Sequence, residues 1–172
     1  DAPRETGSQV SRANPLARIP ALILNDETCI FDSSVIVDYL DTLNDTPILI
    51  PRNDALARMR VKRWEALADG IMDSAVVVRT ESIRPPEKQD ADTITRHNNA
   101  ITRTLEFIAN QLGQAEWCEG AAITLGDLAF FSALVYLDLR QAERNWRDKH
   151  PNLAVWFTKL SGRESVKISL AE

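Results

Sequence analysis

Apolar residues recur at helical spacing through most of the chain after residue 50. One long helix is predicted from Asp54 to about Ser82, because Arg84-Pro85-Pro86 cannot continue it. A second amphipathic series predicts a helix over residues 91–112, with Gly113 as its C-terminal cap. The long helix has a single apolar stripe, made of Trp64, Leu67, Ile71, Ala75 and Val78.

Two further helices are predicted nearer the C-terminus. The third begins after Thr124 and is apolar on nearly every side, which indicates a central and buried position. Thr124 and Asp127 have the spacing of a capping box, so we expect both to be structural. The fourth helix begins at His150-Pro151. The second part of the chain is therefore predicted to be all-helical, with its four tryptophans packed between helices.

The first 50 residues follow a different pattern. Two short β-prone runs, Ala21–Leu24 and Thr28–Phe31, flank the turn Asn25-Asp26-Glu27 and predict a hairpin. A helix is expected to start at Asp32-Ser33-Ser34. Its apolar face would consist of Val35, Ile36, Tyr39, Leu40 and Leu43.

Charge and proline mark a boundary between these two parts. The first 50 residues hold three basic and eight acidic residues, whereas the remainder holds 17 of each sign. Five of the eight prolines lie at or before Pro51. We therefore expect a mixed α/β domain over residues 1–46 and an all-helical domain over residues 52–172.

The composition of the chain excludes several classes of function for this protein. A chain of 172 residues with a net charge of −5 lacks the basic footprint that nucleic acids require. No apolar stretch reaches the length of about 20 residues that a membrane-spanning helix needs. Two cysteines make no disulfide framework and fit a reducing compartment, so we expect a cytoplasmic protein.

The proline before the first β-prone run is a candidate binding element. If the Ile19–Pro20 bond is cis, the backbone of Ile19 turns outward and its N–H and C=O stay free to pair with a peptide-like ligand. The alternative is an ordinary trans turn, since about 5–6% of X–Pro bonds are cis.

A second candidate lies where the first helix begins. Ser33 is a good N-cap residue, and the free N–H groups of a helix N-terminus attract a carboxylate. Asp32 beside it could hold an ammonium group. Together they would recognise the α-amino-acid end of a ligand, and the alternative is a plain helix cap.

The cysteines and histidines carry less chemistry. Cys29 lies within a predicted strand, so we expect it to be buried and inert. Cys118 follows Trp117 in a loop, and we expect it to be a packing or surface residue and not a nucleophile. His97 and His150 have no partners at metal-ligand spacing, and no metal site is predicted.

These segments, in this order, resemble the glutathione S-transferase family over most of the chain. Asn14-Pro15-Leu16-Ala17-Arg18-Ile19-Pro20-Ala21-Leu22 is similar to the family's strand entry, N-P-x-G-K-[IV]-P-x-L. Asp32-Ser33 opens a segment similar to [ED]-S-x-x-I-x-x-Y-L, and Thr124-Leu125-Gly126-Asp127 is similar to the T-x-x-D capping box. Residues 146–153 resemble the W-R-x-x-H-P-x-L stretch of small bacterial members.

The resemblance implies the C-terminal part of a thioredoxin-like domain followed by a helical bundle domain. Glutathione would be the co-substrate, its thiolate reacting with a small electrophile or disulfide. A non-catalytic interaction module with the same fold is the alternative. The implied glutathione-binding residues are Arg18, Ile19, Pro20, Asp32 and Ser33. The implied substrate pocket on the long helix consists of Ile71, Met72, Ala75 and Arg79.

The chain departs from the family pattern at its N-terminus. The family's first strand and first helix have no counterpart here, so we expect the thiol-activating residue upstream of Asp1. The chain as given should then have weak transferase activity or none. Ala17 stands where Gly is usual, and Arg18 where Lys is usual.

A basic cluster suggests a partner surface. Arg58, Arg60, Lys62 and Arg63 crowd the start of the long helix, where its dipole disfavours cations. We expect acidic residues of a second subunit, drawn from Asp38, Asp41 and Asp45, to lie across from this cluster in a homodimer. The alternative is a solvated helix face.

Overall fold

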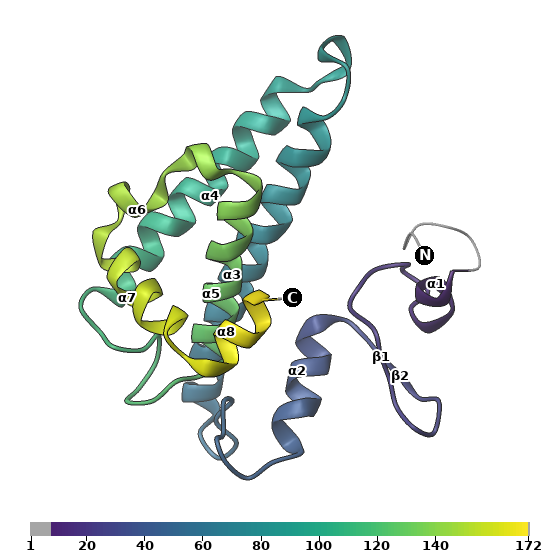
Figure 1. Cartoon of the computed structure of the whole chain (residues 1–172), viewed down its shortest axis with the longest axis vertical. Coiled ribbons are helices and arrows are strands. Elements are labelled where there is room, and N and C mark those ends of the chain that lie inside the picture. The colour runs from purple at the N-terminus through teal and green to yellow at the C-terminus, as the bar shows by residue number, and fades with distance from the viewer. Residues whose placement is uncertain (1–7, 172) are drawn as a thin grey trace. The chain divides into compact units, whose positions relative to one another are not determined.

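The computed structural model describes residues 8–171 and divides into two compact units after Ile50 (Figure 1). Each unit is described by itself. The N-terminal unit contains α1 (Gln9–Ala13), β1 (Leu22–Ile23), β2 (Cys29–Ile30) and α2 (Ser33–Thr42). The expectations that concern residues 1–7 lie outside the described residues.

The predicted hairpin is confirmed, with shorter strands than expected. β1 and β2 pair antiparallel, with Leu22 opposite Ile30 and Ile23 opposite Cys29. The turn between them is closed by the Glu27 N–H, which donates to the Leu24 carbonyl over 3.0 Å. Its direction is fixed further by Asp26, whose Oδ1 accepts from the Thr28 N–H over 3.0 Å.

The helix α2 buries less of its apolar face than its pattern predicts. Of the expected face, Ile36 is buried, whereas Val35, Leu40 and Leu43 are about half exposed. The short helix α1 was not expected from periodicity. It is held at its start by Ser8, whose Oγ accepts from the Ser11 N–H over 3.1 Å.

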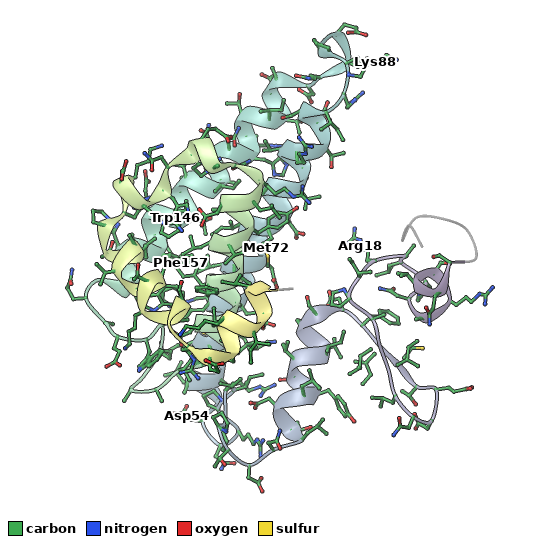
Figure 2. The ribbon with its side chains drawn as sticks, viewed as in Figure 1. Arg18, Asp54, Met72, Lys88, Trp146 and Phe157 are labelled. Atoms are coloured by element: carbon green, nitrogen blue, oxygen red, sulfur yellow. The ribbon has the colours of Figure 1, made fainter. Side chains whose placement is uncertain are left out.

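The C-terminal unit is all helix, as predicted. Its long elements are α3 (Ala55–Ser82), α4 (Ala91–Leu112), α5 (Leu125–Arg140) and α7 (Pro151–Ser161). Shorter pieces complete it: η1 (Pro86–Lys88), η2 (Ala142–Arg144), α6 (Trp146–Lys149) and α8 (Glu164–Ala171). Helix α3 packs along both α4 and α5, and η1 with Lys88 forms the far tip of the α3–α4 hairpin (Figures 1 and 2).

Side chains at the helix ends explain where these helices begin and stop. Asp54 and Asp90 accept hydrogen bonds from the first free N–H groups of α3 and α4. Gly113 ends α4 with a positive φ of 54°, which a glycine adopts at little cost. The predicted start of α7 at Pro151, with His150 before it, is confirmed.

The predicted capping box of α5 is also confirmed. The Asp127 carboxylate is fully buried and accepts from the Thr124 N–H over 2.8 Å and from the Thr124 hydroxyl over 2.9 Å. Its second oxygen accepts from the Cys118 N–H over 2.8 Å. This carboxylate therefore ties the preceding loop to the helix start, which agrees with the structural role expected for it.

Aromatic rings fill the centre of the helical unit. Phe130 of α5 lies between Trp64 of α3 and Trp156 of α7, with ring centroids 6.2 and 5.3 Å apart. Trp146 of α6 is also buried and makes an edge-to-face contact with Phe157 of α7, with ring centroids 5.4 Å apart (Figure 2). Burial of this size stabilises the unit independently of the hairpin. Within the described residues, no helix has the length and apolar character needed to cross a membrane.

Candidate functional site

The loop that enters β1 exposes backbone hydrogen-bonding groups. The Ile19–Pro20 bond is cis, which is one of the two alternatives that the sequence leaves open. The side chain of Ile19 is 68% exposed, and its backbone N–H and C=O make no hydrogen bond to any described residue. This stretch can therefore pair with an extended ligand in the manner of an added strand.

The strand register brings the two predicted binding segments to one end of the hairpin. Leu22 and Ile30 form the last pair of the hairpin, so Pro20 and Asp32 each lie two residues beyond this pair, at the same end. The turn around Asp26 lies at the other end. Pro20 and Asp32, which are 12 positions apart in the chain, thus lie at one end of the hairpin, which is the arrangement that a single ligand needs.

The start of α2 differs in detail from the prediction. Asp32, and not Ser33, is the N-cap residue, and its Oδ1 accepts from the N–H and the hydroxyl of Ser34, each over 3.2 Å. Ser33 is the first helical residue, with its backbone N–H and hydroxyl unpaired within the described chain. The reason for the correction is that the aspartate side chain reaches the N–H two residues on, which leaves the other carboxylate oxygen for a ligand.

Arg18 supplies the positive charge beside these groups. Its side chain is exposed, and its guanidinium makes no ion pair within the described part of the chain (Figure 2). Ala17 before it has a φ of 49°, in the left-handed region where glycine is favoured. The backbone therefore keeps a glycine-like turn although the residue is alanine.

The helical unit contains an apolar cavity of about 600 Å³ between α3, α5 and α8. None of its lining side chains is charged. Hydroxyl groups come from Ser132, Tyr136, Ser165 and Ser169. The apolar lining consists of Met72, Leu128, Phe131, Val135, Leu139, Val166 and Leu170.

The structure places the four predicted substrate-pocket residues in different surroundings. Ile71 and Ala75 are fully buried in the helical core, because the stripe that carries them packs against neighbouring helices. Met72 does line the cavity (Figure 2). Arg79 is exposed on α3 and lies outside the cavity lining. The contributions of α5 and α8 were missed because α5 was expected to be buried on nearly every side.

The two cysteines differ from each other in environment. Cys29 is exposed, contrary to prediction, because β2 is an edge of a two-stranded hairpin with an open face. Cys118 is buried, and burial together with the Asp127 carboxylate raises the pKa of its thiol far above its usual value. Neither shows the electropositive surroundings of a reactive thiolate in the described residues.

The histidines take part in local packing. His97 Nδ1 lies 3.3 Å from the Ser74 hydroxyl. Burial lowers the pKa of His150, which caps α7. Among residues 8–171, no group of three or more potential metal ligands is found.

Three members of the basic cluster have acceptors within their own unit. Arg60 pairs with Glu119 at 3.3 Å, Lys62 pairs with Glu65, and Arg63 donates to Gln111 over 3.3 Å. Asp41, which we expect to face this cluster across a dimer, accepts from the N–H groups of Leu49 and Ile50 of its own chain. Two of the basic side chains, Arg60 and Lys62, thus pair with acidic residues of the same chain, whereas the acceptor of Arg63 is a neutral amide.

Comparison with known proteins identifies the family. A model of the glutathione S-transferase N-terminal domain matches residues 1–43, and one of the C-terminal domain matches residues 91–159. YibF of Escherichia coli K12, an uncharacterized GST-like protein, is 33% identical over 165 residues, covering 96% of this chain and 81% of the relative. The chain belongs to the glutathione S-transferase family.

Two further relatives bear on function. The glutathione-bound crystal structure of a glutathione S-transferase from Methylobacillus flagellatus KT is 40% identical, with a TM-score of 0.89, over 92% of this chain and 78% of that one. Elongation factor 1-gamma of Danio rerio is 27% identical over 92% of this chain and 35% of the relative. The fold is thus a thioredoxin-like N-terminal part followed by a helical domain, as predicted.

Proposed function

We propose that this protein is a glutathione transferase, which binds glutathione at the open end of the hairpin and joins the whole glutathionyl group, through its sulfur, to an uncharged acceptor. The observation that carries the proposal is that Pro20 and Asp32 each lie two residues beyond the last pair of the hairpin, at the same end. Family membership and the glutathione bound to the 40%-identical relative support it.

Each part of glutathione has a chemically matched group in this proposal. The γ-glutamyl carboxylate accepts from the free N–H and hydroxyl of Ser33, and its ammonium pairs with the Asp32 oxygen that does not cap the helix. The cysteinyl part pairs with the backbone of Ile19 beside Pro20. Arg18 attracts the glycine carboxylate.

The acceptor is proposed to place its apolar part in the cavity under α8. A cavity lined by apolar and hydroxyl side chains without a charge favours a neutral molecule, because an ion would lose its hydration without gaining a counter-charge. We retain Met72 as a contact residue and propose Arg79 only as a neighbour of this region. Glutathione is the only co-substrate proposed, and the proposal invokes no metal.

The reaction is a nucleophilic displacement. The glutathione thiolate forms a bond from sulfur to the electrophilic carbon, a leaving group departs with its bonding electrons, and the thiol proton passes to solvent. With a disulfide acceptor, a new mixed disulfide forms and a thiolate leaves. None of the described residues is assigned to thiol activation.

Binding is tested by calorimetry with glutathione and two matched variants. Asp32→Ala should weaken binding by about 1.5–3 kcal/mol, since a charged partner is lost. Asp26→Ala is the control, because Asp26 caps the opposite end of the hairpin through the same type of bond, to the N–H two residues on. Equal affinity of the Asp32 variant and the unaltered chain would refute the site.

Transfer is tested separately with 1-chloro-2,4-dinitrobenzene, a neutral aromatic electrophile. Formation of the thioether and release of chloride, each faster than without protein, would support catalysis. Because the thiol-activating residue is expected upstream of Asp1, this assay uses the natural full-length protein. In that protein, glutathione binding without faster thioether formation would contradict the enzymatic part of the proposal and leave the binding part standing.

A non-catalytic role is the second candidate, and the match to elongation factor 1-gamma favours it. In that case the unit would serve as an interaction module. The two candidates differ in one measurement, because only the transferase accelerates thioether formation at saturating glutathione.

A homodimer in the cytoplasm completes the proposal. Since exposed ion pairs contribute only about 0–1 kcal/mol each, apolar contacts would have to supply most of the affinity. Sedimentation at micromolar concentration decides the point, and a single species with the mass of one chain would refute it.

A further inference from the structure

The chain turns sharply between α1 and β1, and one buried residue holds this turn together. Asn14 is fully buried. Its backbone N–H donates to the Val10 carbonyl, and its own carbonyl accepts from the Ala17 N–H, each over 2.8 Å. Its side-chain Oδ1 accepts from the Leu16 N–H over 2.9 Å, and its Nδ2 donates to the Arg18 carbonyl over 2.8 Å.

The bond to Arg18 determines the direction of the next donor along the chain. The Arg18 carbonyl and the Ile19 N–H belong to the same peptide unit, and in a trans unit these two groups point in opposite directions. Between residues 14 and 20 the cis bond is Ile19–Pro20, so the Arg18–Ile19 unit is trans. Because Asn14 holds the carbonyl toward the interior, the Ile19 N–H points away from it.

We propose that Asn14 is a positioning residue, which aims the Ile19 N–H at a carbonyl oxygen of the bound peptide. Under the proposed function, on which this inference rests, that oxygen is the cysteinyl carbonyl of glutathione. Burial of Asn14 matters here, because water cannot replace the Nδ2 donor at a site without solvent access.

The test combines one substitution with two ligands. Asn14→Asp keeps the size and the Oδ1 acceptor, but sets a carboxylate oxygen against the Arg18 carbonyl. The second ligand is N-(γ-glutamyl)cysteamine, which keeps the γ-glutamyl group and the thiol and lacks the cysteinyl carbonyl together with the glycine. Asn14→Asp leaves the Arg18 side chain, the proposed partner of that glycine, in place. Calorimetry should show about a tenfold weaker affinity for glutathione and a change of less than about twofold for the truncated ligand.

Asn152→Asp is the matched control in the helical unit. There Nδ2 of Asn152 also donates to backbone carbonyls, those of Ala109 at 2.9 Å and Gly113 at 3.0 Å. This variant should leave both affinities unchanged. If Asn14→Asp lowered the affinity for both ligands equally, Asn14 would only maintain the fold, and the proposal would be overturned. An unchanged affinity for both ligands would overturn it as well.

The outcomes separate this inference from the proposed function. If the unaltered chain binds neither ligand, the proposed function fails; if it binds both and the variant weakens both equally, only the role of Asn14 fails. Should Asn14→Asp not fold, the unaltered protein labelled with nitrogen-15 provides the second measurement. Glutathione should shift the Ile19 amide resonance more than the truncated ligand does, and equal shifts would overturn the proposal.

Discussion

Gly126 of α5 lies so close to Trp64 of α3 that a β-carbon at residue 126 would come 2.8 Å from the Trp64 Cβ and 3.2 Å from its Cγ. The Trp64 Cβ is fixed by its own helix, so the two helices would have to separate. Gly126→Ala should therefore lower the free energy of unfolding of the helical unit by about 1–3 kcal/mol. Urea unfolding followed by tryptophan fluorescence measures this, since all four tryptophans lie in that unit.

Gly70→Ala is the matched control for this prediction. Gly70 lies in the middle of α3, and a β-carbon there would meet no atom within 4 Å. Alanine should stabilise the helix at this position by about 0.5–1 kcal/mol. A loss of stability in both variants would contradict the explanation by close packing.

Ala17→Gly should stabilise the N-terminal unit. Ala17 adopts a φ of 49°, where a β-carbon costs about 1–2 kcal/mol. Glycine removes this cost but has a larger conformational entropy in the unfolded chain, so the free energy of unfolding should rise by about 0.5–1 kcal/mol. Amide hydrogen exchange in β1 and β2 reports on this unit alone. Ala21 precedes β1 and lacks a positive φ. Ala17→Gly should therefore slow amide exchange in β1 and β2, whereas Ala21→Gly should speed it.

The cavity under α8 should discriminate by charge. N-phenyl-1-naphthylamine is neutral, and 8-anilino-1-naphthalenesulfonate has the same ring system with one negative charge. The neutral dye should bind about tenfold more tightly, because no lining residue offers a cation to the sulfonate. Fluorescence titration of both dyes measures the ratio.

Two variants of α8 locate the dye. Ser169→Trp fills the cavity and should abolish the fluorescence enhancement, whereas Lys167→Trp lies outside the lining and should preserve it. Retained binding in Ser169→Trp, or equal affinity for both dyes, would show that the dyes bind elsewhere.

The two thiols should react with alkylating reagents at very different rates. Cys29 is exposed, whereas Cys118 is buried and its raised pKa removes the thiolate that reacts. Iodoacetamide at pH 8 should therefore modify one thiol in the native protein and both after denaturation. Mass spectrometry identifies the site, and Cys29→Ser should eliminate the native-state product.

Prediction from sequence succeeded where one local signal determines the structure. The bounds of α4 follow from its regular apolar series and from Gly113, and α5 begins where Thr124 and Asp127 form their capping box. Short helices such as α1 escaped prediction because five residues contain little more than one turn of periodicity.

The candidate site was harder to predict than the fold. The choice between Asp32 and Ser33 as helix cap depends on backbone angles, since both residue types cap well. Ile71 and Ala75 belong to the apolar stripe that the sequence predicts for α3, and the structure buries both in the core, whereas Met72, which lies outside this stripe, lines the cavity. The cavity itself depends on α8, which lies more than 80 residues further along the chain.

The turn of the hairpin is also a suitable place to insert a peptide tag. Its turn at Asp26 and Glu27 lies at the opposite end from Pro20 and Asp32, and both turn residues are exposed. A peptide tag inserted between Asp26 and Glu27 would lengthen the turn without altering any residue of either strand. The protein could thus be immobilised through this turn on a sensor surface with its proposed ligand-binding edge directed toward the solution.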